Sequence, residues 1–137
     1  MAVIFWLSSR TADESSAQSN EILVWLYRVF GDNFFTTFIV RKLAHCLEFC
    51  GLCVLFNLSL YLTREKLSPL LAIAFTSLYA VTDEVHQLFV QGRSCELRDW
   101  VIDTCAAAVG TLGFLALFYI IKAIAGKFSS KALTEEK

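Results

Sequence analysis

The sequence predicts an all-α membrane protein. We expect a transmembrane helix bundle with three full spans, preceded by a truncated or interfacial hydrophobic segment and an amphipathic surface helix. Hydrophobic residues make up 56% of the 137 residues, with 12 Phe and one Pro, and the mean hydropathy is +0.56. This is too apolar for an ordinary soluble domain. The hydrophobic residues also fall into runs that reach the roughly 20 residues a helix needs to cross a bilayer.

The charge of the chain limits its partners. The formal net charge is −1, and no basic stripe interleaved with aromatic residues is present, so we expect no nucleic-acid partner. The lipid bilayer is the partner that the composition predicts. We expect a single membrane domain over residues 1–123 and a polar, Lys-rich tail over residues 124–137. The sequence does not specify an oligomeric state.

The first 30 residues predict two elements. Residues 1–8 are apolar but too short to cross a membrane alone. We expect either the end of a helix that begins upstream or a segment resting in the interface. A polar linker, Ser8 to Asn20, follows. Asn20 and Glu21 are typical of a helix start, and the pattern through Phe30 suits a helix on a membrane surface that ends at residues 31–33.

Three hydrophobic runs then predict the spans. The first runs from Phe34 to Leu62. The second begins at Ser68, a helix cap, with Pro69 at the first helical position, and continues to about Val90. The third runs from Asp99 to about residue 123.

Each run keeps its ionisable residues at one end. These residues are Arg41, Lys42, His45 and Glu48 at the start of the first run, Asp83, Glu84, His86 and Gln87 at the end of the second, and Asp99 and Asp103 at the start of the third. Antiparallel crossing places all three ends on one side of the bilayer. Because a charged group near the membrane core costs about 2.5 to 3.5 kcal/mol on insertion scales, we expect these residues to form a functional site.

Helical periodicity predicts which residues share a face. On the first run these are Arg41, His45 and Glu48. On the second they are Thr76, Tyr79, Asp83, His86 and Gln87, with Glu84 pointing away. On the third, Asp99 and Asp103 continue into a seam of small residues, Ala106, Gly110 and Gly113, which lets helices approach closely in lipid.

A metal site is one interpretation of these residues. His45-x-x-Glu48 and Asp83-x-x-His86 have the carboxylate and His spacing of helix-bundle metal sites, which hold zinc, iron or manganese. Cationic neighbours oppose a metal cation, and no His-Glu-x-x-His signature is present. We therefore expect no metal cofactor and favour a salt-bridged network or an anion site built on it. Arg93, in Gly92-Arg93-Ser94, suits capture of a phosphate or carboxylate.

The cysteines predict no obligatory disulfide. Cys46, Cys50 and Cys53 share a helical stripe with Asn57, which is typical of buried thiols. Cys95 lies in the loop after the second run, and the cysteine count is odd.

The polar residues resemble a known family. Their order is Arg41-Lys42-x-x-His45-x-x-Glu48-Phe49, Tyr79-x3-Asp83-Glu84-x-His86-Gln87-x-Phe89, Gly92-Arg93-Ser94, Asp99-x3-Asp103 and Gly110. In type and order these blocks resemble the VanZ-like family of small bacterial membrane proteins, from about Ala2 to Gly113. The resemblance implies a cell-envelope role, since the family's namesake is linked to resistance to the glycopeptide teicoplanin.

Three functions fit these observations. In the first, the protein handles an anionic envelope intermediate or glycopeptide-related ligand at the outer leaflet. Arg41, Lys42 and Arg93 attract the anion, while His45, Glu48, Asp83 and His86 orient it or move a proton. The other candidate ligand-binding residues are Tyr79, Glu84, Gln87, Asp99 and Asp103. The second is an intramembrane hydrolase or transferase that uses the same His and carboxylates, with or without a metal. The third is a non-catalytic accessory membrane protein.

The lysines predict a multi-pass protein of the cell membrane with a cytoplasmic C-terminus. Lys66 and the tail lysines, Lys122, Lys127, Lys131 and Lys137, gather on one side, which the positive-inside rule assigns to the cytoplasm. The arginines of the other side, Arg28, Arg93 and Arg98, have acidic neighbours. We therefore expect the polar site to face outside.

Overall fold

The computed structural model describes the backbone of residues 1–30 and 35–135 and the side chains of residues 1–29 and 35–127. Within these residues the protein consists of helices and contains no strand, which confirms the predicted all-α class. The helices are α1 (Ala2–Ser8), α2 (Ala12–Phe30), α3 (Thr37–Arg64), α4 (Pro69–Gln87) and α5 (Leu97–Glu135).

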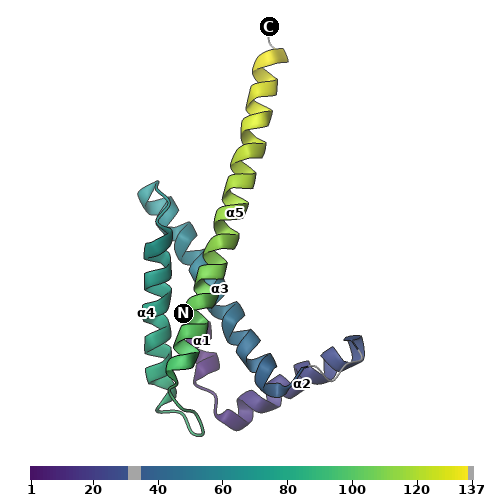
Figure 1. Cartoon of the computed structure of the whole chain (residues 1–137), viewed down its shortest axis with the longest axis vertical. Coiled ribbons are helices and arrows are strands. Elements are labelled where there is room, and N and C mark those ends of the chain that lie inside the picture. The colour runs from purple at the N-terminus through teal and green to yellow at the C-terminus, as the bar shows by residue number, and fades with distance from the viewer. Residues whose placement is uncertain (31–34, 136–137) are drawn as a thin grey trace.

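Helices α3, α4 and α5 pack on one another as a bundle. Figure 1 shows α3 crossing α5 and then diverging from it toward its own N-terminus, where α2 lies across it. The short α1 packs on α4. Its Ile4 is buried in the same cluster as Phe49 and Ala80, so α1 contributes to the bundle core.

The described part of the chain has two helices that are long and apolar enough to cross a membrane, where the sequence predicted three. Among the described residues these are Thr37–Arg64 and Leu97–Lys127. Helix α4 has 19 residues, but its last five, from Asp83, are mostly polar. The apolar part, residues 69–82, spans only about 21 Å at 1.5 Å per residue, which is less than the hydrocarbon thickness of about 30 Å.

The two long helices expose most of their apolar side chains. Only 28% of the most apolar window of α3 and 22% of that of α5 is buried inside the protein. Leu47 and Leu62 of α3 and Leu112 of α5 are among the exposed residues. A core helix of a soluble protein would be mostly buried. The exposed apolar surface of these two helices is therefore typical of a surface that contacts lipid.

The predicted small-residue seam is the point where α3 and α5 cross. A Cβ atom added at Gly110 would lie 2.4 Å from the carbonyl oxygen of Cys50, so only glycine fits. Ala106 is buried beside it. Gly113, the last member of the predicted seam, has nothing within 4 Å of an added Cβ. The close contact is therefore shorter than the seam that the sequence predicted.

Helix α2 begins earlier than predicted. Glu14 N donates to Thr11 Oγ1 (3.3 Å), and Thr11 N donates to Glu14 Oε2 (3.0 Å). This reciprocal pair is a capping box, and it starts the helix at Ala12. The prediction of a polar linker from Ser8 to Asn20 is therefore wrong. Asn20 lies inside the helix, where its Oδ1 accepts from the hydroxyl of Thr37 (2.6 Å). The predicted helix end at residues 31–33 and the predicted start of the first span at Phe34 lie outside the described residues.

The remaining boundaries lie close to the predictions. Ser68 is the N-cap of α4 and Pro69 its first residue, as predicted, and α4 ends at Gln87. Helix α5 begins at Leu97 and continues to Glu135, through most of the predicted tail. Lys122 and Lys127 are exposed on it, while the side chains of Lys131 and Lys137 lie outside the described ones.

Candidate functional site

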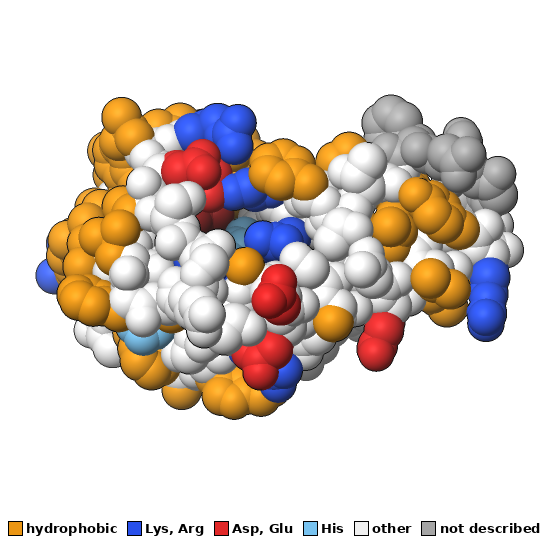
Figure 2. Space-filling model, turned by 90° about the horizontal axis from the view of Figure 1, so that it is seen from below, with side chains coloured by type: hydrophobic (Ala, Val, Ile, Leu, Met, Phe, Trp, Pro, Cys, Tyr) orange, Lys and Arg blue, Asp and Glu red, His pale blue; other side chains and the backbone are white. Residues whose placement is uncertain are grey.

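The three polar helix ends meet at one end of the bundle. The start of α3, the end of α4, the start of α5 and the loop of residues 88–96 enclose a pocket of about 120 Å³. Figure 2 shows this end, where cationic, acidic and His side chains gather in a hollow with hydrophobic side chains around it. The predicted site residues in the pocket wall are Arg41, Lys42, His45, Glu84, Gln87, Arg93, Asp99 and Asp103.

A second, larger pocket adjoins the first. Its volume is about 380 Å³, and it lies between α1, α2 and α3. Arg41, His45 and Arg93 line both pockets, so these three side chains form the wall that the two pockets share. Glu48 lines only the larger pocket.

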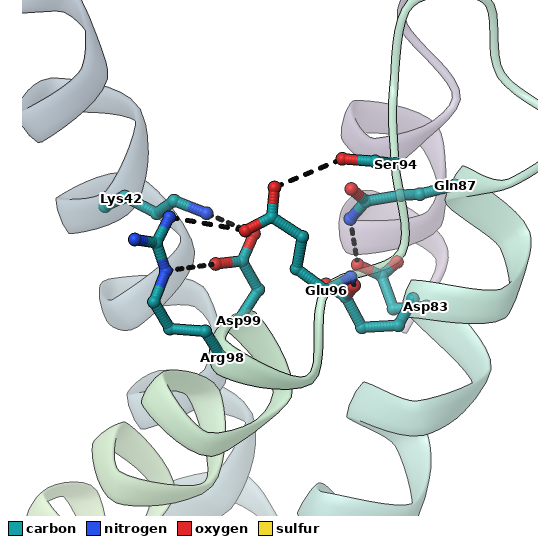
Figure 3. A network of polar contacts seen from close by, with 8 residues as sticks. Lys42, Asp83, Gln87, Ser94, Glu96, Arg98 and Asp99 are labelled. Atoms are coloured by element: carbon teal, nitrogen blue, oxygen red, sulfur yellow. Dashed lines mark hydrogen bonds and ion pairs between the residues drawn. The ribbon is translucent and has the colours of Figure 1, made fainter.

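Charged pairs hold the rim of the smaller pocket together (Figure 3). Lys42 forms an ion pair with Asp99. Arg98 Nη2 lies 3.3 Å from Glu96 Oε2, and Arg98 Nε lies 3.9 Å from Asp99 Oδ1. Two of the basic residues at this end are therefore occupied by carboxylates.

The acidic residues of α4 are buried and hydrogen-bonded. Gln87 Nε2 donates to Asp83 Oδ2 (3.0 Å), and Glu96 N donates to Glu84 Oε2 (2.8 Å). Glu84 lines the smaller pocket together with Gln87, so the prediction that it points away from the face that Gln87 shares is wrong, whereas its selection as a site residue stays a prediction. Because both α3 and α5 pack on α4, its buried face is centred between Asp83 and Glu84, and periodicity alone does not fix that centre.

Among the described residues, the hydrogen bonds of Arg41 and Arg93 go to neutral oxygens only. Arg41 Nη2 donates to Ser16 Oγ (2.7 Å), and Arg93 Nε donates to the carbonyl oxygen of Arg10 (3.0 Å). Arg41 Nε is buried and has no hydrogen-bond partner in the described part of the chain. Burial, and after it the positive charge of Arg41, lower the pKa of Arg93, while the charges of Asp83, Glu48 and Glu84 act in the opposite direction. The two guanidinium groups thus repel each other across the shared wall.

Glu48 and His45 complete the wall of the larger pocket. Glu48 Oε2 is buried and has no hydrogen-bond partner among the described side chains. The charges of Asp83 and Arg93 act on this carboxyl group. The imidazole of His45 stacks on Phe49 with ring centroids 6.4 Å apart. A carboxyl group and an imidazole are groups that can exchange a hydrogen bond or a proton with a ligand, and both lie in this wall.

Three predicted site residues line neither pocket. Asp83 is buried against Gln87, and His86 and Tyr79 lie toward the N-terminal segment. His86 Nε2 is 3.1 Å from Ser9 Oγ, and its ring lies 4.3 Å from that of Phe5. The hydroxyl of Tyr79 donates to the carbonyl oxygen of Met1 (2.9 Å). Both side chains contact the N-terminal segment and line neither pocket. The structure therefore does not bring His86 together with His45, Glu48 and Asp83.

Sequence reasoning missed the contribution of α2 and Glu96. Ser15, Gln18, Ser19 and Ile22 line the larger pocket, with the i, i+3, i+4, i+7 spacing of one helix face. The Thr11-x-x-Glu14 capping box was the signal that could have found them, since it extends the helix back to Ala12. The backbone contact of Glu96 with Glu84 had no signal in the sequence.

The donor set for a metal is dispersed in this structure. Among residues 1–29 and 35–127, no group of three or more His, Cys, Asp or Glu side chains could hold a metal ion. The two pairs that the spacing predicted, His45 with Glu48 and Asp83 with His86, do not come together as one donor set, because His86 turns toward α1.

Comparison with known proteins agrees with the resemblance seen in the motifs. No curated protein and no solved structure matches the chain. A family model described as VanZ/LLP1 matches residues 1–121, a range that includes the four polar blocks, Gly110 and both pockets. Together with the two lipid-facing helices, this match identifies a membrane protein that belongs to the VanZ/LLP1 family.

Proposed function

We propose that the polar end of the bundle binds the anionic group of a cell-envelope intermediate or glycopeptide-related ligand at the outer leaflet. Through this ligand the protein contributes to the envelope's response to glycopeptides of the teicoplanin type. The family supports the envelope role, and the geometry of the site supports the anion.

The observation that carries the proposal is that Arg41 and Arg93 have no carboxylate hydrogen-bond partner among the described residues. A guanidinium has five N–H donors, yet the hydrogen bonds of Arg41 and Arg93 within the described chain are one each, to neutral oxygens. Lys42 and Arg98, by contrast, pair with carboxylates. A phosphate or carboxylate between the two arginines would receive forked hydrogen bonds from both and remove their mutual repulsion.

The experiment is recovery of the ligand with the protein. The wild type is purified from membranes in mild detergent and examined by native mass spectrometry, where we expect a bound phosphate- or carboxylate-bearing molecule. The Arg41→Gln, Arg93→Gln double variant should lose it. Arg98→Gln is the matched control, because Arg98 is 63% exposed and pairs with Glu96 at the rim. Equal occupancy in the double variant and the control would contradict the proposal.

A second candidate function is acid–base catalysis on the bound ligand. Glu48 favours it, because a buried carboxyl oxygen without a protein partner among the described residues faces the larger pocket. In a hydrolase or transferase it would take or supply a proton, with His45 beside it. Glu48→Gln would then keep the bound ligand but stop its conversion. If wild type and variant recover the same unchanged molecule, the site binds without catalysis.

Orientation can be read from a native cysteine. Cys95 is exposed in the loop of residues 88–96, at the polar end. The other cysteines lie within α3 and α5. With the polar end outside, a membrane-impermeant thiol reagent should label whole cells, after permeabilisation of any outer membrane, and Cys95→Ser should abolish the label. Labelling that requires broken cells would place the site in the cytoplasm and exclude outer-leaflet ligands.

A further inference from the structure

The two pockets differ in what they can hold. Ligand pockets for small molecules usually measure about 300 to 1,000 Å³. The smaller pocket, at about 120 Å³, has room for a few water molecules, since one water takes up about 30 Å³ of the liquid. The larger pocket, at about 380 Å³, falls in the range for a ligand. The ligand of the arginine pair therefore occupies the larger pocket.

The lining of the larger pocket has an amphiphilic character. Charged side chains come from Arg41 and Arg93 and from the carboxyl groups of Glu21 and Glu48, whereas Leu7, Ile22 and Val40 supply apolar surface. A soluble anion such as free phosphate would leave the apolar side chains without a matching contact. A ligand with a charged head and a hydrocarbon chain matches both parts.

Apolar surface continues from the pocket to the outside of the protein. Ile22 lines the pocket and is itself 49% exposed, and Trp25, one turn along α2, is also exposed. On α3, Leu43 and Leu47 are exposed next to the pocket residues Ala44 and Glu48. In a membrane these side chains contact lipid, and tryptophan is typical of the interface.

We propose that the ligand is a membrane lipid with a phosphate monoester head, whose phosphate lies between Arg41 and Arg93 and whose chain leaves between α2 and α3 into the bilayer. This inference rests on the anion-binding function proposed above and names its substrate class. A phosphate monoester monoanion has three non-ester oxygens, of which the two unprotonated ones can accept from the two forked donors. The third is a hydroxyl, which can donate to Oε2 of Glu48, a group without a partner among the described residues.

The test compares ligands that share either the phosphate head or the long apolar chain, in nanodiscs of neutral lipid. The probes are a long-chain isoprenoid monophosphate, a fatty acid of similar chain length and glycerol 3-phosphate. The isoprenoid phosphate should bind the full-length protein at least 100-fold more tightly than either other probe. Its affinity should fall at least tenfold in the Arg41→Gln, Arg93→Gln double variant.

Two variants test the path of the chain. Ala44→Phe places a large side chain in the larger pocket only and should weaken isoprenoid phosphate binding at least tenfold, whereas Ala123→Phe, exposed at the far end of α5, should not. Ile22→Ser is the alternative if Ala44→Phe does not fold, because Ile22 is half-exposed. It should weaken isoprenoid phosphate binding and leave the weak binding of glycerol 3-phosphate unchanged.

The outcomes separate this inference from the function on which it rests. Equal affinity for glycerol 3-phosphate and isoprenoid phosphate would overturn the lipid and keep the anion site. Equal affinity for the fatty acid would overturn the phosphate. Isoprenoid phosphate binding that survives loss of both arginines would be partition into the bilayer, and it would overturn both proposals.

Discussion

The two halves of the bundle hold their helices together differently. At the crossing of α3 and α5, backbones and small side chains touch: Gly110 lies against the carbonyl of Cys50, and Asn57 Nδ2 donates to Thr111 Oγ1 (3.0 Å). At the polar end α3 has moved away from α5 (Figure 1), and long side chains such as Lys42 and Asp99 connect the helices instead.

This difference explains why the pockets lie where they do. Tight contact at the crossing fixes the angle between α3 and α5, and the angle opens a space below it that α1, α2 and charged side chains fill incompletely. The same helices are therefore closely packed at their crossing and hold the ligand site at their polar end. Variants that act on one level should leave the other intact, apart from changes at the crossing itself.

Gly110→Ala should give the largest loss of stability. Overpacking a well-packed core costs about 1 to 3 kcal/mol, and here the added Cβ meets backbone, so we expect the upper part of this range or more. Gly113→Ala is the matched control, since its added Cβ meets nothing within 4 Å. Thermal unfolding in detergent measures both. Equal midpoints would show that the crossing is not closely packed.

Glu48→Gln and Asp83→Asn should leave the fold intact and abolish function. Both replacements keep the size of the side chain, and the carboxamide that replaces the Asp83 carboxylate would still accept from the amide of Gln87. The measurement is an envelope phenotype, such as growth in teicoplanin, at matched protein levels in the membrane. A wild-type phenotype in both variants would favour the accessory function, in which the charges only hold the helices.

Lys42→Met should destabilise the protein more than Arg98→Met. The side chains of the Lys42 and Asp99 pair are 22% and 16% exposed, against 63% and 46% for Arg98 and Glu96. A hydrogen bond to a charged group contributes about 1.5 to 3 kcal/mol, whereas an exposed ion pair contributes about 0 to 1 kcal/mol. Denaturant unfolding of the two variants gives the comparison. A larger loss of stability in Arg98→Met would show that the Arg98 pair, and not the Lys42 pair, holds the polar end together.

Gly92→Ala should have a smaller effect, confined to the polar end. Gly92 has φ of +75°, and an added Cβ would lie 3.0 Å from Ala12 Cβ. A left-handed residue with a side chain costs about 1 to 2 kcal/mol. The free energy of unfolding should therefore fall by no more than about 2 kcal/mol. Ligand binding should also be weaker, because the loop carries Arg93. Gly126→Ala, in open space on α5, is the control. Unchanged ligand binding in Gly92→Ala would show that the loop adapts.

Much of the fold follows from sequence patterns. Hydrophobic runs predicted the bundle, antiparallel crossing predicted that the polar helix ends meet, and Gly110 was predicted at a close contact. The span count failed at α4, because a run of apolar residues was counted together with the polar turns that end it. Local patterns do not say how far a helix reaches into the bilayer.

The site was predictable in its residue types more than in its partners. Lys42, His45 and Asp103 line the smaller pocket as expected, while His86 turns to Ser9 and Glu84 turns inward. Those directions depend on how α4 is rotated against α1, α3 and α5, which is a tertiary property. The role of Ser16 as a partner of Arg41 likewise needs the position of α2 over α3.

The most direct test of the account is a double-mutant cycle on Arg41 and Arg93, which lie on different elements and act on one anion in our proposal. Isoprenoid monophosphate affinity is measured in nanodiscs for the wild type, Arg41→Gln, Arg93→Gln and the double variant. We predict that each single change removes most of the binding and that the double variant is little worse than either, a coupling of about 0.5 to 3 kcal/mol. Independent, additive losses, or no loss in either single variant, would contradict a shared anion site.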